Sequence, residues 1–266
     1  MMSLPEAIQP EDVANFQRGA AENRLFWARF GEKPDLQSAT VLDVGSGWGC
    51  LCVEMAQAGA ARVVGLDLKT HLVDFANAYL MQVYPELVQR VKFQAIDLKD
   101  FAEPVCFDLI VSKDSFEHIL DLDGMLREMR LRLKPGGRIY AGFGPLYPTP
   151  YGDHDRRETI FRHWGVFGRL LAWLPWGHLV LEPLIVKTYN SHADRKITSL
   201  YDLGLNKLAA SDYLRLFQAS GLRVVGLRLN QSQSLQSRLF SVLRHVPGLE
   251  DYCTHSLYCI LEKPAT

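Results

Sequence analysis

Short runs of aliphatic and β-branched residues recur along the first 143 residues, separated by stretches whose apolar positions have helical spacing. Runs that are apolar throughout are typical of parallel strands buried on both faces. The alternation predicts an α/β fold with a doubly wound, Rossmann-like sheet. The expected strands are 40–45, 62–67, 91–97, 107–112 and 137–143, and the expected helices are about 49–58, 70–82 and 121–133.

The pattern changes at both ends of this region. Residues 1–37 contain one or two amphipathic helices, which we expect to cover an edge of the sheet. Prolines, glycines and aromatics interrupt the alternation over 144–207, after which a helix and two strands follow. We therefore predict a seven-stranded sheet with an antiparallel last strand and an inserted lid after the fifth strand. The domain assignment is 1–266 as one domain, with 1–37 as its helical cover and 144–207 as a substrate-binding lid.

Charge and cysteine content narrow the classes of partner. Thirty acidic and 29 basic residues give a net charge of -1 without a basic cluster, so a nucleic-acid partner is not expected. The five cysteines have neither C-x-x-C pairing nor zinc-like spacing, which indicates buried thiols in a reducing compartment. The N-terminus lacks the basic and apolar segments of a secretory signal. We expect a cytoplasmic protein.

The most apolar window is "WGVFGRLLAWLPWGHLVLEPLIV", residues 164–186. Arg169, Pro175, Glu182 and Pro183 interrupt it, so a transmembrane segment is not expected. Its aromatic residues could enclose an acceptor, pack the insertion onto the sheet, or make transient contact with a membrane surface, and the sequence leaves these three interpretations open.

A glycine-rich segment and three acids indicate a nucleotide site. "VLDVGSGWGC" places three glycines where the first strand turns into the first helix, close to Asp43. Asp67 and Asp97 end the next two strands, and a strand-terminal acid can accept hydrogen bonds from ribose hydroxyls. A dinucleotide fingerprint asks for glycine or alanine at position 50, which is Cys50 here. Dinucleotide binding stays the alternative within this fold.

Five motifs together are similar to those of class I S-adenosylmethionine-dependent methyltransferases acting on small molecules. They are "LDVGSGWG", "VVGLD", "QAIDL", "FDLIVSKDSFEHI" and "MLREMRLRLKPGGRIYAGF", and the resemblance covers about 38–143. It implies S-adenosylmethionine as cofactor and a small-molecule substrate. It also implies roles for nine residues: Asp43, Gly45 and Gly47 at the methionine end, Asp67 and Leu68 at the ribose, Asp97 and Leu98 at the adenine, and Ser112 and Lys113 closing the methionine pocket.

The acceptor decides which catalytic groups are needed. A hydroxyl acceptor must lose a proton, so it needs a base or a metal, whereas an amine needs only its neutral form. We expect a hydrophobic acceptor methylated at oxygen, with C- or N-methylation or a non-catalytic nucleotide-binding protein as alternatives. The catalytic candidates are His154 first, with Tyr151 and His118. For His163, His178 and His192 structural roles are favoured.

The stretch "SKDSFEHI", residues 112–119, has a second interpretation. If Asp114 begins a helical turn, then Asp114, Glu117 and His118 share one face. The pattern D-x-x-E-H is similar to the E-x-x-E-H metal motif of ubiquinone-pathway O-methyltransferases and small-RNA 2′-O-methyltransferases. This resemblance implies a divalent metal, with His154 or His192 as a fourth ligand. The alternative is that Glu117 and His118 bind no metal and only line the path of the acceptor. Nothing in the sequence indicates the oligomeric state.

Overall fold

The expected strands form in the structure, a computed structural model that describes residues 8–231 and 235–265. The fifth strand begins four residues before its expected start, at Leu133. The prediction of a seven-stranded, Rossmann-like α/β sheet is confirmed. The strands are β1 (Thr40–Val44), β2 (Arg62–Asp67), β3 (Val91–Ala95), β4 (Phe107–Lys113), β5 (Leu133–Phe143), β6 (Arg223–Leu229) and β7 (Leu257–Glu262).

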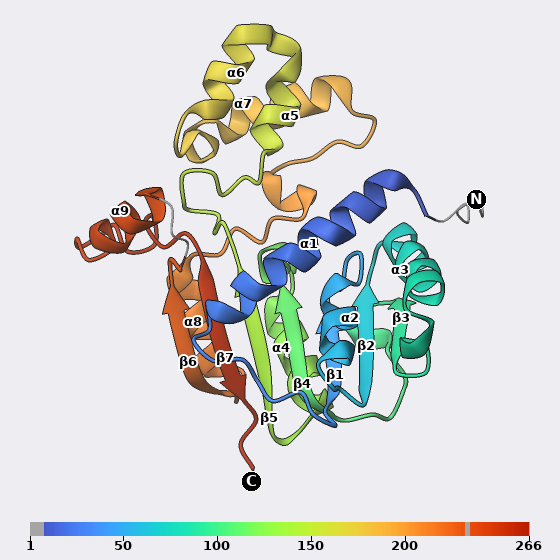
Figure 1. Cartoon of the computed structure of the whole chain (residues 1–266). Coiled ribbons are helices and arrows are strands. Elements are labelled where there is room, and N and C mark those ends of the chain that lie inside the picture. The colour runs from blue at the N-terminus through green and yellow to red at the C-terminus, as the bar shows by residue number, and fades with distance from the viewer. Residues whose placement is uncertain (1–7, 232–234, 266) are drawn as a thin grey trace.

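The strand order is β3-β2-β1-β4-β5-β7-β6 (Figure 1). Strands β1 to β5 pair in parallel, and β7 is antiparallel to both of its neighbours, β5 and β6. The predicted antiparallel last strand is therefore confirmed, and it lies inside the sheet while β6 forms the edge. The parallel strands place all their carboxyl ends at one edge, where ligands of such sheets bind.

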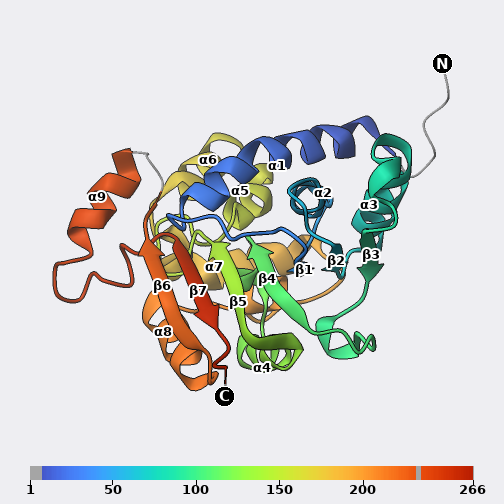
Figure 2. The same cartoon turned by 60° about the horizontal axis from the view of Figure 1, so that its bottom comes forward.

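Helices cover both faces of the sheet (Figure 2). Alternate residues of each strand point to opposite faces, so Val41 joins one core cluster and Leu42 the other. On the first face lie α1 (Pro10–Ala28), α2 (Cys50–Gln57) and α3 (Thr70–Val83), and on the second α4 (Leu122–Arg132) and α8 (Ala210–Ala219). The remaining helix of the C-terminal part is α9 (Leu235–Leu243).

The long N-terminal helix α1 crosses a face of the sheet, so the expectation that residues 1–37 cover an edge is wrong. Phe16 packs against Tyr79 of α3, and Phe26 and Trp27 extend the same buried stripe towards Tyr140 of β5. Nineteen helical residues span close to 30 Å, which is enough to reach from β5 to α3.

Residues 144–207 form a separate group of helices above the carboxyl ends of the strands (Figure 1). They include α5 (Arg156–Phe161), α6 (Gly165–Trp173) and α7 (Gly177–His192) and have their own small core around Phe161 and Ile185. Five 3-10 turns complete the described elements: η1 (Pro85–Leu87), η2 (Leu98–Asp100), η3 (Phe116–His118), η4 (Arg162–Trp164) and η5 (Leu200–Leu203). None of the helices in the described ranges has the length and hydropathy that crossing a membrane would require.

Candidate functional site

The glycine-rich turn joins β1 to α2 at the carboxyl edge of the sheet. Gly47 has a φ of 52°, and a Cβ added there would meet nothing within 4 Å, so the backbone is open at this point. The N–H groups of Gly45 and Ser46 donate to Leu66 O, and the N–H of Gly47 donates to Asp67 Oδ2 at 2.9 Å. The end of β2 therefore fixes the turn and holds the Asp67 carboxylate beside it.

Asp43 on β1 is a buried carboxylate with only one oxygen bonded. The Cys52 thiol donates to its Oδ2 at 3.2 Å, whereas Oδ1 has no hydrogen-bond partner among the described residues. Burial raises the pKa of Asp43 to about 7. The buried hydroxyl of Ser46 also lacks a partner within the described part of the chain. Buried polar atoms are normally satisfied, so these two beside the open turn indicate a place for a polar ligand.

Two further acids end their strands at the same edge. Asp67 and Asp97 each accept a hydrogen bond at Oδ1 from the backbone N–H two residues further along the chain. Each acid thus holds its local turn with one oxygen. The second oxygen, Oδ2, accepts from the N–H of Gly47 in Asp67 and lies 3.8 Å from Lys99 Nζ in Asp97. The side chain of Leu68 is exposed, whereas that of Leu98 is packed into the second core cluster. Leu98 can therefore offer a ligand only its backbone.

The end of β4 connects the glycine turn to α1. Ser112 Oγ donates to Val44 O at 2.9 Å, which ties β4 to the end of β1. Lys113 Nζ donates to Asn23 Oδ1 at 3.2 Å and to Gly19 O at 3.4 Å. The N-terminal helix therefore closes over the same place as the predicted cofactor residues.

Asn23 is a site residue that the sequence analysis missed. It is fully buried, and its Nδ2 has no hydrogen-bond partner in the ranges that the structure describes. It lies on the buried stripe of α1 with Phe16, Phe26 and Trp27. One signal in the sequence could have identified it. Asn23 is a single asparagine at a helix position where the spacing of the apolar residues calls for an apolar side chain.

The stretch that follows β4 differs from the expectation. Asp114 has a φ of 51°, and its N–H donates to Gly142 O. The helical turn starts later, as η3 at Phe116. The prediction that Asp114 begins the turn is therefore wrong, and so is the shared face derived from it. A Cβ added at Gly45 would lie 2.2 Å from Ser115 Oγ, so this stretch abuts the glycine turn.

Glu117, His118 and His154 form a cluster whose candidate ligand atoms all lie within 4.8 Å of one another. Glu117 is buried, and its Oε1 accepts from the N–H of Gly144 at 3.1 Å. Its Oε2 has no partner among residues 8–231 and 235–265. The two imidazole rings meet edge to face with centroids 4.8 Å apart. Asp114 is not a member of this group.

Backbone carbonyls orient both imidazoles of the cluster. His118 Nδ1 lies 2.9 Å from Gly204 O, and His154 Nε2 lies 2.8 Å from Pro145 O. Because a carbonyl only accepts, these nitrogens carry the protons and the other ring nitrogens keep their lone pairs. Burial lowers the pKa of His118, and burial together with the neighbouring His118 lowers the pKa of His154 to about 4. Burial raises the pKa of Glu117 to about 8.

The three histidines for which structural roles were favoured lie outside this cluster. The rings of His163 and His192 stack on each other with centroids 5.4 Å apart. His178 is fully buried, its Nε2 lies 2.6 Å from Tyr147 O, and its Nδ1 lies 3.7 Å from Asp153 Oδ1. His154 is thus the histidine of the insertion that approaches His118.

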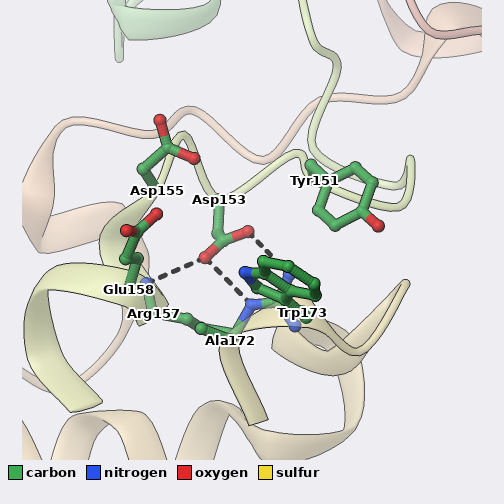
Figure 3. A pocket seen from close by; sticks show the side chains of 7 residues that line it. All are labelled: Tyr151, Asp153, Asp155, Arg157, Glu158, Ala172 and Trp173. Atoms are coloured by element: carbon green, nitrogen blue, oxygen red, sulfur yellow. Dashed lines mark hydrogen bonds and ion pairs between the residues drawn. The ribbon is translucent and has the colours of Figure 1, made fainter. Parts of the chain in front are cut away.

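Tyr151 lines a cavity whose lining does not include His118 or His154. This cavity of about 210 Å³ lies within the 144–207 segment. In it, Asp153 and Arg157 form a buried ion pair with Nε and Oδ2 3.0 Å apart, and Trp173 lies over them (Figure 3). Tyr151 is not a member of the cluster of Glu117, His118 and His154.

The sequence is similar to known methyltransferases. The family model described as a methyltransferase domain matches residues 41–137. The ubiquinone biosynthesis O-methyltransferase of Xanthomonas euvesicatoria pv. vesicatoria is 33% identical over 177 residues, which cover 60% of this chain and 71% of that protein. The enzyme of the same name from Pseudomonas paraeruginosa is 32% identical over 185 residues, covering 63% of this chain and 75% of that protein.

The fold is also similar to a solved structure. An S-adenosylmethionine-dependent methyltransferase from Mesorhizobium loti superposes with a TM-score of 0.55 at 17% identity, over 92% of this chain and 99% of that one. This likeness supports the fold, and the sequence relatives support the family. The chain belongs to the class I S-adenosylmethionine-dependent methyltransferases, enzymes that take their methyl group from that cofactor.

Proposed function

We propose that this enzyme transfers a methyl group to an oxygen atom of a small, apolar acceptor, which a divalent ion at Glu117, His118 and His154 helps to position and ionise. The observation that carries the proposal is this cluster: a buried carboxylate with one unpartnered oxygen faces two imidazoles fixed by backbone carbonyls. The cluster adjoins the glycine turn through Ser115, so an acceptor held there lies next to the donor site.

The cofactor assignment is part of the proposal. Asp43, Gly45 and Gly47 hold the methionine end, Asp67 and Leu68 the ribose, Asp97 and the Leu98 backbone the adenine, and Ser112 and Lys113 close the pocket. Three buried atoms without a hydrogen-bond partner among the described residues, Asp43 Oδ1, Ser46 Oγ and Asn23 Nδ2, support this fit. They offer acceptors and a donor of the kind that an amino-acid ammonium and carboxylate require.

The donor set of the cluster suits a divalent metal. Two neutral imidazoles and a carboxylate are ligands of zinc, iron or manganese, and a ring N–H bonded to a carbonyl is the usual outer support of such a ligand. Donors at about 2.1 Å from one tetrahedral ion lie about 3.4 Å apart. The set spans up to 4.8 Å, so its widest pair must approach by about 1.4 Å to hold an ion. Asp114, the ligand first expected, is replaced by His154.

The chain's own groups would then act in the transfer as follows. S-adenosylmethionine supplies a methyl group bound to a positively charged sulfur, and a divalent ion favours the ionised form of a hydroxyl. His118 and His154 each keep a lone pair on the ring nitrogen that does not face a carbonyl, and Glu117 would add negative charge beside them once a cation is bound. With a pKa near 4, His154 is a weak proton acceptor, which favours its role as a ligand over that of a general base. Alignment of acceptor and donor supplies the remaining acceleration.

The oxygen acceptor and the lid have separate support. The relatives are named for O-methylation in ubiquinone biosynthesis. Segment 144–207 contributes Pro145 O, His154 and Gly204 O to the cluster, and Asn206 ties it to η3 by donating to Phe116 O at 2.6 Å. We assign this segment as the substrate-binding lid of a single domain, 1–266, and residues 1–37 as the cofactor cover.

The test separates metal binding from cofactor binding. Protein dialysed against a chelator should lose methyl transfer to a hydroxylated aromatic acceptor and regain it with zinc, manganese or iron. His154→Asn should bind metal at least about tenfold more weakly, with S-adenosylhomocysteine affinity unchanged by calorimetry. His163→Asn, an exposed histidine of the same segment, is the matched control. Full activity after chelation would reject the metal, and transfer only to nitrogen or carbon would reject the acceptor assignment.

A further inference from the structure

The outer face of α6 is apolar and exposed to solvent. Phe167, Leu170 and Trp173 have 61, 65 and 74% of their surface exposed. Their spacing, with Val166 and Leu174, follows one helical face, while Gly168 and Ala172 point inward. Side chains this exposed do not pack the insertion onto the sheet, so that interpretation is wrong for them.

A second helix, α9, has the same property. On α9, Leu235, Leu239 and Val242 are exposed by 83, 55 and 68% at helical spacing, whereas Phe240 is buried. The Phe240 ring contacts Trp176, in the link between α6 and α7, with centroids 6.1 Å apart. Helix α9 therefore touches the link that follows α6, and each of the two helices carries its own exposed apolar stripe.

Both stripes are basic as well as apolar. Residues 159–181 include Arg162 and Arg169, residues 230–249 include Arg238 and Arg244, and neither segment contains an aspartate or glutamate. In the part of the chain that the structure describes, none of these four arginines forms an ion pair. Such a charge distribution is unusual in a chain whose net charge is -1.

We propose that the exposed faces of α6 and α9 dock the enzyme on a lipid bilayer that carries anionic headgroups. Helices with an exposed apolar stripe, aromatic residues and a basic flank bind at the interface of such bilayers, and tryptophan such as Trp173 prefers the headgroup level. A second copy is a poor occupant, since pairing these faces would bring arginines together without acids to meet them. Docking would present the insertion to apolar molecules dissolved in the membrane.

The direct test uses vesicles and the whole protein without cofactor or acceptor, so it is independent of the proposed reaction. The protein should float with vesicles of phosphatidylcholine plus phosphatidylglycerol, bind more weakly to phosphatidylcholine alone, and dissociate as salt rises. Arg169→Glu with Arg238→Glu should weaken binding at least about tenfold. Phe167→Ser with Trp173→Ser should do the same by removing apolar contact.

The matched controls lie on α4. Leu131→Gln replaces an equally exposed leucine, and Arg127→Glu reverses an exposed charge, and neither should change vesicle binding. Retained S-adenosylhomocysteine affinity shows that each variant is folded. Absence of wild-type binding to anionic vesicles overturns the proposal. Equal loss of vesicle binding in the α4 variants also overturns it. The proposal fails as well if the wild type is a dimer that Phe167→Ser with Trp173→Ser dissociates while vesicle binding stays unchanged.

Discussion

Asp43 and Glu117 stand at the two ends of the candidate site and have much in common. Each is buried and, within the described residues, accepts a side-chain or backbone hydrogen bond at one carboxylate oxygen only. Burial raises the pKa of both groups, to about 7 and about 8. They differ in where their neighbours come from. The hydrogen-bond partner of Asp43, Cys52, lies nine residues further along the chain, whereas Gly144 and His154 reach Glu117 from the insertion.

This difference separates the donor end of the site from the acceptor end. The glycine turn is fixed by the ends of parallel strands, whose geometry is common to the fold. The cluster around Glu117 depends on a segment that contributes no strand to the sheet. Such a segment can change without disturbing the core, so one fold can keep its donor and vary its acceptor.

The largest expected effect is on chemistry and arises at the acceptor end. Glu117→Gln should lower kcat for methyl transfer about a thousandfold, because a carboxamide cannot take on the negative charge that the Glu117 carboxyl would acquire beside a bound cation. The Kd for S-adenosylhomocysteine, measured by calorimetry, should change by less than about threefold. If cofactor affinity fell as much as activity, the two ends would be one site and the comparison would fail.

A substitution at the donor end is expected to weaken cofactor binding. Asp43→Asn should weaken S-adenosylhomocysteine binding by up to about a hundredfold, since it removes a charged acceptor from a buried position. Asp74→Asn, which alters an exposed acid on α3, is the control and should leave affinity unchanged. Metal affinity should be the same in both variants. Wild-type cofactor affinity in Asp43→Asn would remove Asp43 from the donor end.

Asn23 tests whether α1 belongs to the donor end. Asn23→Ala removes the unpartnered donor and should weaken S-adenosylhomocysteine binding about fivefold. Hydrogen exchange should show α1 protected by the ligand in the wild type and less so in the variant. Asn15→Ala, on the same helix but only partly buried, serves for comparison. Equal exchange in α1 with and without ligand would make α1 a purely structural cover.

The sequence predicted the donor end of the candidate site better than the acceptor end. Strand positions and the acids at 43, 67 and 97 were predictable, because apolar runs and strand-end positions are local features of the sequence. The role of Asn23 was hidden, since only the packing of α1 across the sheet buries its side chain.

At the acceptor end, prediction reached residue types but not their arrangement. His154 was a candidate and does meet His118. The left-handed backbone at Asp114 delays the helical turn by two residues, which the letters D-x-x-E-H do not reveal. The exposure of Trp173 was equally hidden, because an aromatic residue at helical spacing usually packs inward.

The smallest expected effect concerns stability and sharpens the contrast between the two carboxylates. The folded pKa of Asp43 is about 7 against a model value of 3.8. The native protein therefore holds a proton that the unfolded chain loses. This stabilisation is complete below about pH 4 and disappears as the pH rises through 7. Asparagine stays neutral throughout, so Asp43→Asn without cofactor should be more stable than the wild type at pH 8, by roughly 2 kcal/mol.

At pH 3.5 the advantage of Asp43→Asn should nearly vanish, because Asp43 is then mostly neutral in the unfolded chain as well as in the native wild type. Urea unfolding at both pH values measures the difference, and Glu117, whose raised pKa gives a slope of the same sign, cancels between the two proteins. A variant less stable than the wild type at pH 8 would mean that the Asp43 carboxylate is satisfied inside the protein. In that case the unpartnered Oδ1 would not mark a ligand site, and the assignment of the donor end would rest on the glycine turn and Asp67 alone.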